Sequence, residues 1–144
     1  GGAGGAMRLV EAGVIRTKSA LPLERRLLDL AEGVGQVIDE FHPEVLAVEE
    51  LYSHYAHPKT AVIMGHARGV FFLLAGKAGM PVHSYSATRI KKSLTGAGHA
   101  TKDQVARMLA NMMHLDTSAG PADVTDAIAT AVCHLRTVTH GGIR

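Results

Sequence analysis

Short apolar runs alternate with longer amphipathic patterns along this chain, and prolines or glycines separate them. The run from Val45 to Val48 lies between a proline and two acids, which predicts a buried strand. The segment from Pro81 to Tyr85 predicts a second strand. The segment from Met7 to Arg16 alternates imperfectly but is rich in β-branched residues, so it predicts a third. Strands that alternate with helices indicate a layered α/β fold, and neither a linker nor an internal repeat divides the chain.

Helical patterns fill the segments between the expected strands. From Pro22 to Pro43 apolar side chains recur at steps of three and four, which predicts an amphipathic helix that ends before the second proline. Thr101 and Gln104 fit a capping box at the start of a later helix. The side chains of that helix expected to face inward are Val105, Met108, Leu109 and Met112. The remaining helices are predicted over residues 60–78, 87–94 and 122–137.

Charge is distributed unevenly, although the formal net charge is only +2. Residues 21–50 carry eight acids against two arginines, whereas residues 51–115 carry eight bases against Asp103 alone. The second segment therefore has a net charge of +7 and suits a polyanion, because neutralising phosphates releases counterions. A solvated surface without a partner is the alternative, and charge alone does not separate the two.

Signals for a membrane or for secretion are not found. No run reaches the roughly 18 uncharged apolar residues of a membrane helix, and Lys77 interrupts the most apolar stretch, Val70 to Ala78. The chain starts with six Gly and Ala residues, Gly1 to Ala6, which predict a flexible loop and not a leader. The single Cys133 excludes an internal disulfide. We expect a cytoplasmic protein with no membrane partner.

The last predicted helix carries a narrow polar band made of Asp123, Asp126, Thr130 and His134. The band runs beside an apolar face formed by Val124, Ala127, Ile128, Ala131, Val132, Leu135 and Val138. Two acids three residues apart point the same way, and like charges held together need a cation or a proton. Acids in a first helical turn also stabilise the positive end of the helix dipole, by about 0.3–1 kcal/mol each. The acid pair alone therefore does not identify a site.

Glu49 and Glu50 directly follow the first buried strand, at the end where open α/β sheets gather ligands. Side chains alternate along a strand, so only one of the two can face a given side, and solvated glutamates are the alternative. A strand-end glutamate and the two helix aspartates together supply three oxygen ligands suited to Mg²⁺. Two such ions about 4 Å apart would activate a water and stabilise the leaving oxygen of a phosphodiester.

Basic and aromatic residues accompany these acids. Lys91 and Lys92 precede a glycine-rich turn and Lys102 opens the next helix, where backbone N–H groups can approach phosphate. Tyr52 and Tyr55 follow the strand-end glutamates and can stack on an unpaired base, with simple surface cover as the alternative.

The nine histidines raise the question of a zinc site. His54, His57 and His66 cluster in sequence but lack a metal-binding spacing, so incidental imidazoles are expected there. His134 differs because it shares the polar band with Asp126 and could support the metal site or the attacking water.

Four segments, in order and spacing, resemble the RuvC family of Holliday-junction resolvases. They are Ala12–Lys18, the strand ending at Glu49, Gly65–Gly69 and Ala122–Ala127. The resemblance runs from about Met7 to His140 and implies an RNase H-like mixed sheet flanked by helices, in a single domain over residues 1–144. It also implies a homodimer that nicks opposed strands of a four-way DNA junction during recombination and repair. Such an enzyme uses Mg²⁺ or Mn²⁺, with two ions per active site, and works with the RuvA-RuvB branch-migration complex.

The resemblance also assigns roles to individual positions. The catalytic and metal-binding carboxylates fall on Glu49, Asp123 and Asp126. The DNA-binding residues fall on Tyr52, Lys91 and Lys102, and Lys92 adds to this set by its position. The helix with Gly65 and Gly69 resembles the family's dimer helix, in which small residues allow close packing.

One family landmark has no match. The family opens with a strand reading approximately Gly-Ile-Asp-Pro-Gly, whose aspartate is the first metal ligand, whereas the Gly/Ala stretch here resembles a later loop. Because that strand is central to the fold, we expect these 144 residues alone to be marginally stable, with little or no cleavage. With the strand restored, Glu49→Gln or Asp123→Asn should abolish nicking and spare junction binding.

Two alternative functions follow from the same residues. A non-catalytic junction-binding protein would keep the lysines and the tyrosine but cut nothing. Another RNase H-like protein, such as a YqgF-type nuclease, is the second. A sugar-kinase relative would need two phosphate-binding glycine loops after strands, and neither is found.

Overall fold

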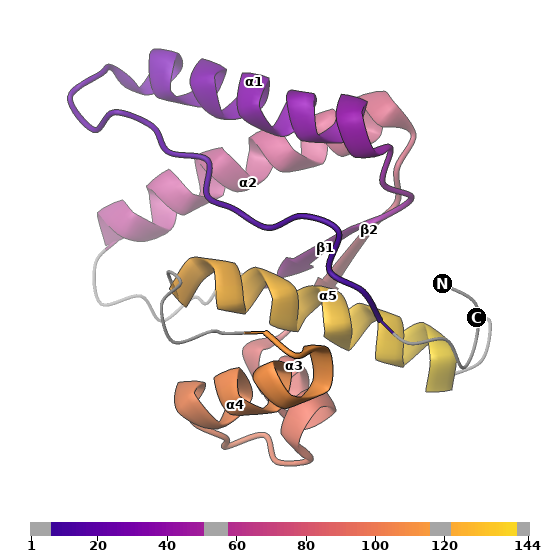
Figure 1. Ribbon diagram of the computed structural model, residues 1–144. Coiled ribbons are helices and arrows are strands. Elements are labelled where there is room, and N and C mark those ends of the chain that lie inside the picture. The colour runs from indigo at the N-terminus through magenta and orange to yellow at the C-terminus, as the bar shows by residue number, and fades with distance from the viewer. Residues whose placement is uncertain (1–6, 51–57, 116–121, 141–144) are drawn as a thin grey trace. The chain divides into compact units, whose positions relative to one another are not determined.

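The computed structural model describes residues 7–50, 58–115 and 122–140. Within these ranges the chain forms five helices and two strands (Figure 1). They are α1 (Leu23–Phe41), β1 (Leu46–Glu49), α2 (Pro58–Ala78), β2 (Val82–Tyr85), α3 (Ala87–Thr95), α4 (Lys102–Met113) and α5 (Ala122–His140). The α/β class is therefore confirmed, and the predicted helix and strand positions hold to within a few residues for these seven elements.

β1 and β2 pair side by side in a two-stranded sheet. The Leu46 N–H donates to the Pro81 carbonyl at 2.9 Å, and the Glu50 N–H donates to the Tyr85 carbonyl at 2.8 Å. The partner's residue number rises together with the strand's own number, so the two strands run parallel. α2 is the crossover helix that a parallel pair requires.

The chain divides into two compact units. The first unit comprises Gly1–Val14, Ala47–Glu50 and Ser84–Arg144, so it contains α3, α4 and α5. The second unit comprises Ile15–Leu46 and Leu51–His83, so it contains α1 and α2.

The core of the first unit lies between α3, α4 and α5. Its buried residues are Tyr85, Ile90, Leu94, Ala100, Val105, Leu109, Ile128, Ala129, Val132 and Cys133. Val105 and Leu109 face inward as predicted, but Met108 is 37% exposed, which corrects the expectation for that side chain. Met108 lies about 100° around α4 from Leu109, at the edge of the buried face, and its side chain is therefore partly exposed.

α5 buries a different face from the one expected from its apolar residues. Thr130 and His134, which belong to the predicted polar band, are buried, while Leu135 and Val138 of the predicted apolar face are exposed. The inward side of α5 is therefore partly polar, and its outward side is partly apolar.

The second unit is built on the packing of α1 against α2. Close approach is required at Gly33, where an added Cβ would lie 2.7 Å from the Ile15 side chain. Among the described residues of this unit, Ala75 and Met80 are the buried apolar side chains. Large apolar side chains that stay exposed on its two helices are Leu23, Leu28, Val37, Val62, Ile63, Met64, Phe72 and Leu73.

α2 is long and apolar enough to cross a membrane by length and composition alone, the one such helix among the described residues. It contains no run of 18 uncharged residues, because Arg68 lies within it. The Arg68 guanidinium stacks over the Phe72 ring at 4.9 Å. A single helix of this kind is weak support for a membrane span. An exposed apolar helix is also what a protein–protein interface requires.

The strand predicted over Met7–Arg16 is not formed, and residues 7–18 have no regular secondary structure. Apolar side chains here stay exposed, with Val10 at 64%. A β-rich composition needs a partner strand to pair with, and no described residue pairs with this segment as a ladder.

Candidate active site

Glu49 is the last residue of β1, at the carboxyl end of the parallel pair. The next residue, Glu50, donates its N–H to the carbonyl of Tyr85, so the end of β1 is tied to the end of β2. Glu49 is exposed to solvent on one side and lines a pocket on the other. The predicted place of this glutamate, at a strand end where ligands gather, is the place it takes in the structure.

Asp126 lies on α5, one turn after the helix begins. Its side chain is half-buried and lines the same pocket as Glu49. Asp123 is exposed in the first turn of α5 and is not among the described residues that line this pocket. The structure therefore brings Glu49 together with Asp126, and leaves Asp123 outside the pair.

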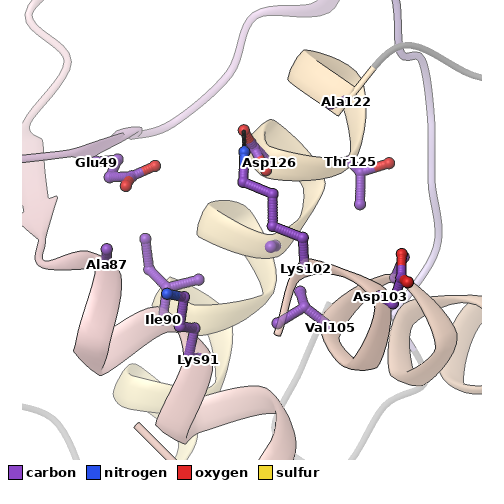
Figure 2. A pocket seen from close by; sticks show the side chains of 12 residues that line it. Glu49, Ala87, Ile90, Lys91, Lys102, Asp103, Val105, Ala122, Thr125 and Asp126 are labelled. Carbon is purple, nitrogen blue, oxygen red and sulfur yellow. Dashed lines mark ion pairs between the residues drawn. The ribbon is translucent and has the colours of Figure 1, made fainter. Parts of the chain in front are cut away.

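The pocket has a volume of about 340 Å³, and four elements of the first unit contribute charged side chains to it. Glu49 comes from β1, Lys91 from α3, Lys102 from α4 and Asp126 from α5. The apolar wall consists of Ala87, Ile90, Val105, Ala106, Ala122 and Ala129. Figure 2 shows the Lys102 side chain extended from α4 to the Asp126 carboxylate, with the Glu49 carboxylate beside them at the end of β1. Asp103 of α4 is a third acid in the lining, so three acids and two bases share this pocket.

The electrostatics of this pocket disfavour a negative charge on Glu49. Partial burial raises the pKa of the Glu49 carboxyl above its usual value, and the nearby Asp126 carboxylate raises it further. Lys102 and Lys91 oppose this rise. A divalent cation between the two carboxylates would remove the repulsion that the lysines only partly offset.

Lys102 forms an ion pair with Asp126, with Nζ 3.8 Å from Oδ2 (Figure 2). The lysine side chain is 78% exposed and the aspartate 44%, so the pair contributes roughly 0.2–1 kcal/mol at most. An ammonium that is exposed and weakly held can exchange the carboxylate for another anion. Lys102 is therefore placed to serve either as a counterion for the acid or as a phosphate contact.

Local capping fixes the two helices that carry these lysines. The Ser86 hydroxyl accepts the Arg89 N–H at the start of α3, and α3 ends at Gly96 with a positive φ of 82°. The predicted capping box of α4 is confirmed, since Thr101 and Gln104 exchange both hydrogen bonds.

The turn between α3 and α4 is packed closely against the start of α3. A Cβ added at Gly98 would lie 2.8 Å from the Thr88 methyl, so only glycine fits there without a shift. Glycine in this turn therefore serves the packing of two helices.

His134 lies deeper in the first unit than expected. It is 6% exposed and its Nδ1 lies 2.6 Å from the Tyr85 hydroxyl, with the two rings edge to face. It is not among the described residues that line the pocket. The sequence pattern did not single out Tyr85, although an aromatic residue at a strand end beside a serine cap was the available signal.

Of two other expected site residues, one lies elsewhere and the other is not described by the structure. Lys92 is exposed on α3 and does not line the pocket. Tyr52, like Tyr55, lies outside the described residues.

The donor set suits a small hard cation. No group of three or more His, Cys, Asp or Glu side chains that could hold a metal ion is found in the described parts of the chain. Mg²⁺ needs fewer protein ligands than that, because it commonly binds through one or two carboxylates together with waters and a substrate phosphate. Glu49 and Asp126 provide such a pair.

Comparisons with known proteins identify the family of the chain. The family model described as "Crossover junction endodeoxyribonuclease RuvC" matches residues 2–134. A protein of that name from Rhodopirellula baltica is 42% identical over 125 residues, covering 87% of this chain and 70% of the relative. Another from Hydrogenovibrio crunogenus is 41% identical over 132 residues, covering 92% of this chain and 75% of the relative. The chain belongs to the RuvC family.

Solved RuvC structures have the same fold. T. thermophilus RuvC in complex with a Holliday junction substrate superposes with a TM-score of 0.87 at 33% identity, covering 93% of this chain and 81% of that one. A second T. thermophilus RuvC structure gives a TM-score of 0.87 at 31% identity, covering 98% and 84%. The RNase H-like fold expected from the resemblance is thereby confirmed.

Membership in the RuvC family also makes the chain an endonuclease by descent, as expected. It does not test the roles of individual residues. The assignments to Glu49, Asp123, Asp126, Tyr52 and the lysines therefore stay predictions, as does the single-domain boundary.

Proposed function

We propose that this chain forms the catalytic unit of a resolvase that nicks four-way DNA junctions with the help of Mg²⁺ or Mn²⁺. The observation that carries the proposal is the pocket in which Glu49 and Asp126 meet Lys91 and Lys102. The repulsion between the Glu49 and Asp126 carboxylates would be relieved by a bound cation. The lysines beside them suit the phosphate that the cation would also bind.

Glu49 and Asp126 would hold the metal, with Asp123 as an outer carboxylate one turn away. When bound, the metal supplies an activated water and stabilises the leaving oxygen of the phosphodiester. The protein's own part is to hold Glu49 and Asp126 in one pocket, where Lys91 and Lys102 partly offset the rise in the pKa of the Glu49 carboxyl. The same lysines, with Lys92 on the exposed side of α3 and Tyr52, would bind and orient the DNA.

A four-way junction with a matched linear duplex as competitor tests the proposal. Mn²⁺ binding to the 144-residue chain should weaken by roughly tenfold or more in Glu49→Gln and in Asp126→Asn, because each removes one ligand charge. Asp103→Asn is a matched control, since Asp103 lines the pocket but lies on α4 away from the paired carboxylates. Unchanged Mn²⁺ binding in both variants would refute the metal site.

Nicking is measured on the same substitutions in a chain extended by a strand that bears the family's first aspartate. We expect a loss of roughly a hundredfold or more in nicking rate, with junction affinity held within about twofold, because binding rests mainly on phosphate contacts. A variant that lost binding and kept its cutting rate would contradict the assignment of Glu49 and Asp126.

Junction binding without cleavage is the second candidate function. It is supported by Lys91 and Lys102 in the pocket, which would contact phosphate whether or not a metal ion is bound. Equal junction affinity with and without Mg²⁺, together with no nicking by the extended chain, would establish it.

The homodimer expected for the family would use α2. An added Cβ at Gly65 or Gly69 meets nothing within 4 Å, and exposed apolar side chains flank both positions. A second copy of α2 would cover these groups, and small residues would let the two backbones approach closely. The partnership with RuvA-RuvB and the cytoplasmic location stay predictions.

A further inference from the structure

A buried polar contact behind the pocket joins β2 to α5. The hydroxyl of Tyr85 lies 2.6 Å from Nδ1 of His134, and both side chains are almost fully buried. Burial raises the pKa of Tyr85, although Arg89 opposes the rise, so at neutral pH the phenol keeps its proton and can donate it. Each partner satisfies the other's buried polar atom, and a satisfied polar pair within an apolar core favours one arrangement of the elements that it joins.

The main chain of Tyr85 is hydrogen-bonded to the end of β1, next to Glu49. Its carbonyl accepts the Glu50 N–H at 2.8 Å, and Glu50 is the direct neighbour of Glu49. The position of Tyr85 therefore fixes the end of β1 where Glu49 leaves the strand. One residue thus holds Glu49 through its backbone and α5 through its side chain.

The side chain of His134 is linked to the other carboxylate, that of Asp126, through the helix α5. His134 and Asp126 lie on the same helix, two turns apart, with Thr130 between them. The Thr130 hydroxyl donates to the Asp126 carbonyl at 2.8 Å, and Thr130 is itself buried. A helix moves as a rigid rod over this length, so a bond at His134 also places Asp126.

Other contacts keep α5 folded against its neighbours when this bond is absent. Arg136 donates to the Ser93 carbonyl of α3 and reaches the Met112 sulfur of α4 at 3.8 Å. Arg89 stacks over the Tyr85 ring at 4.9 Å and contacts the Thr137 hydroxyl at 3.5 Å. Loss of one hydroxyl at Tyr85 should therefore shift α5 slightly and leave the unit folded.

We propose that Tyr85 and His134 are a positioning pair that sets the separation of Glu49 and Asp126 for the metal ion. The proposal rests on the metal site described under the proposed function. Neither residue touches the metal or the DNA; they act through the strand end and the helix that carry the ligands. A directional hydrogen bond favours one position of α5 along β2. Apolar contacts of similar size would discriminate less between neighbouring positions.

Three variants of the full chain test the proposal. Tyr85→Phe keeps the ring and removes the hydroxyl, and His134→Leu removes the imidazole. The double variant removes both polar partners, so no buried group is left without a bond and much of the lost stability should return. Leu109→Val is the matched control, because Leu109 is fully buried in the same unit and lies away from the pocket.

Two quantities are measured: the free Mn²⁺ concentration by electron paramagnetic resonance, and the melting temperature. We expect Mn²⁺ affinity to fall by roughly tenfold in Tyr85→Phe, the scale seen when groups that orient metal ligands are removed. The double variant should regain melting temperature but not Mn²⁺ affinity. Leu109→Val should lose stability and keep its affinity within about twofold.

Amide hydrogen exchange at Glu50 gives a readout that needs no metal. The Glu50 N–H should exchange faster in Tyr85→Phe than in Leu109→Val, because its acceptor on Tyr85 is less well fixed.

Mn²⁺ affinity that followed melting temperature across all four variants would reduce the pair to core packing and overturn the proposal. Failure of the metal site gives a different pattern, in which Glu49→Gln and Asp126→Asn also leave Mn²⁺ binding unchanged. That result would overturn the positioning role as well, since nothing would remain to position.

Discussion

The two compact units of this chain bury their side chains in opposite ways. The first unit has a continuous apolar core between three helices and also buries polar groups, Thr130 and His134. The second unit buries little beyond Ala75 and Met80 among its described residues, while many large apolar side chains stay exposed on α1 and α2. The unit with the candidate active site thus buries its apolar side chains in its own core, whereas the unit with α1 and α2 leaves many of them exposed.

This difference separates two uses of hydrophobic residues. In the first unit they stabilise a framework that holds charged groups at fixed positions. In the second unit they form a surface that is stable only when something covers it, for which a second copy is the occupant proposed above.

Core substitutions should show the largest difference between the units. Leu109→Ala, at a fully buried position, should lower the free energy of unfolding by about 2–5 kcal/mol. Leu73→Ala, at a position 59% exposed on α2, should change it by less than about 0.5 kcal/mol in the monomer. Urea denaturation at low protein concentration measures both. Equal losses at the two positions would remove the distinction between the units.

A bulky residue on α2 should affect assembly and not folding. Gly69→Leu fills the open space beside the helix and should weaken self-association by at least about tenfold, as overpacking at a close contact does. Gly35→Leu on α1 also meets open space and serves as the control. Sedimentation velocity over a concentration series measures the dimer fraction, and an unaltered fraction in Gly69→Leu would argue against α2 as the interface.

Lys102→Ala should weaken DNA binding in a manner that depends on salt. If Lys102 exchanges Asp126 for a phosphate, the slope of log affinity against log salt concentration should fall by about one unit. Lys77→Ala, in the last turn of α2, is a basic control from the other unit. Fluorescence anisotropy with a four-way junction measures the slopes. An equal fall in both variants would place DNA contacts on both units, and an unchanged slope in Lys102→Ala would argue against Lys102 as a phosphate contact.

Glu49→Gln should give the smallest effect, a gain in stability. Because the folded-state pKa of Glu49 is raised, ionisation of Glu49 opposes folding above that pKa. In chelator the variant should unfold with a free energy higher by less than about 1 kcal/mol at pH 7, the scale for partly exposed charges. The gain should disappear as the pH falls through the folded pKa toward 4.5, the ordinary value for glutamate. A gain that was constant from pH 4 to pH 8 would mean that charge is not its cause.

Local signals predicted most of the fold. Pro43, the capping box at Thr101 and the apolar run before Glu49 each depend on a few neighbouring residues, and each element that they mark is present. The strand expected over residues 7–16 is absent because a strand depends on its partner, which no local pattern encodes.

Periodicity predicted the site only in part. It placed Asp123 and Asp126 in one band, but Asp123 lies about 4.5 Å further toward the start of α5, so that only Asp126 lines the pocket. It also placed His134 in the polar band, without indicating that Tyr85, 49 positions earlier in the chain, would bind it within the core. Contacts between distant elements decide both cases.

The close fit of Gly98 against Thr88, together with the capping box of α4, has a consequence for how DNA would be recognised. The backbones that carry Lys91 and Lys102 lose their freedom when the chain folds, so little backbone entropy remains to be lost on binding. Lys91 and Lys102 lie on two helices whose separation this turn fixes. A DNA backbone with a matching phosphate spacing would contact both lysines, and a differently curved backbone would not. Discrimination among DNA shapes would then depend on Gly98, through the close packing of its turn against Thr88.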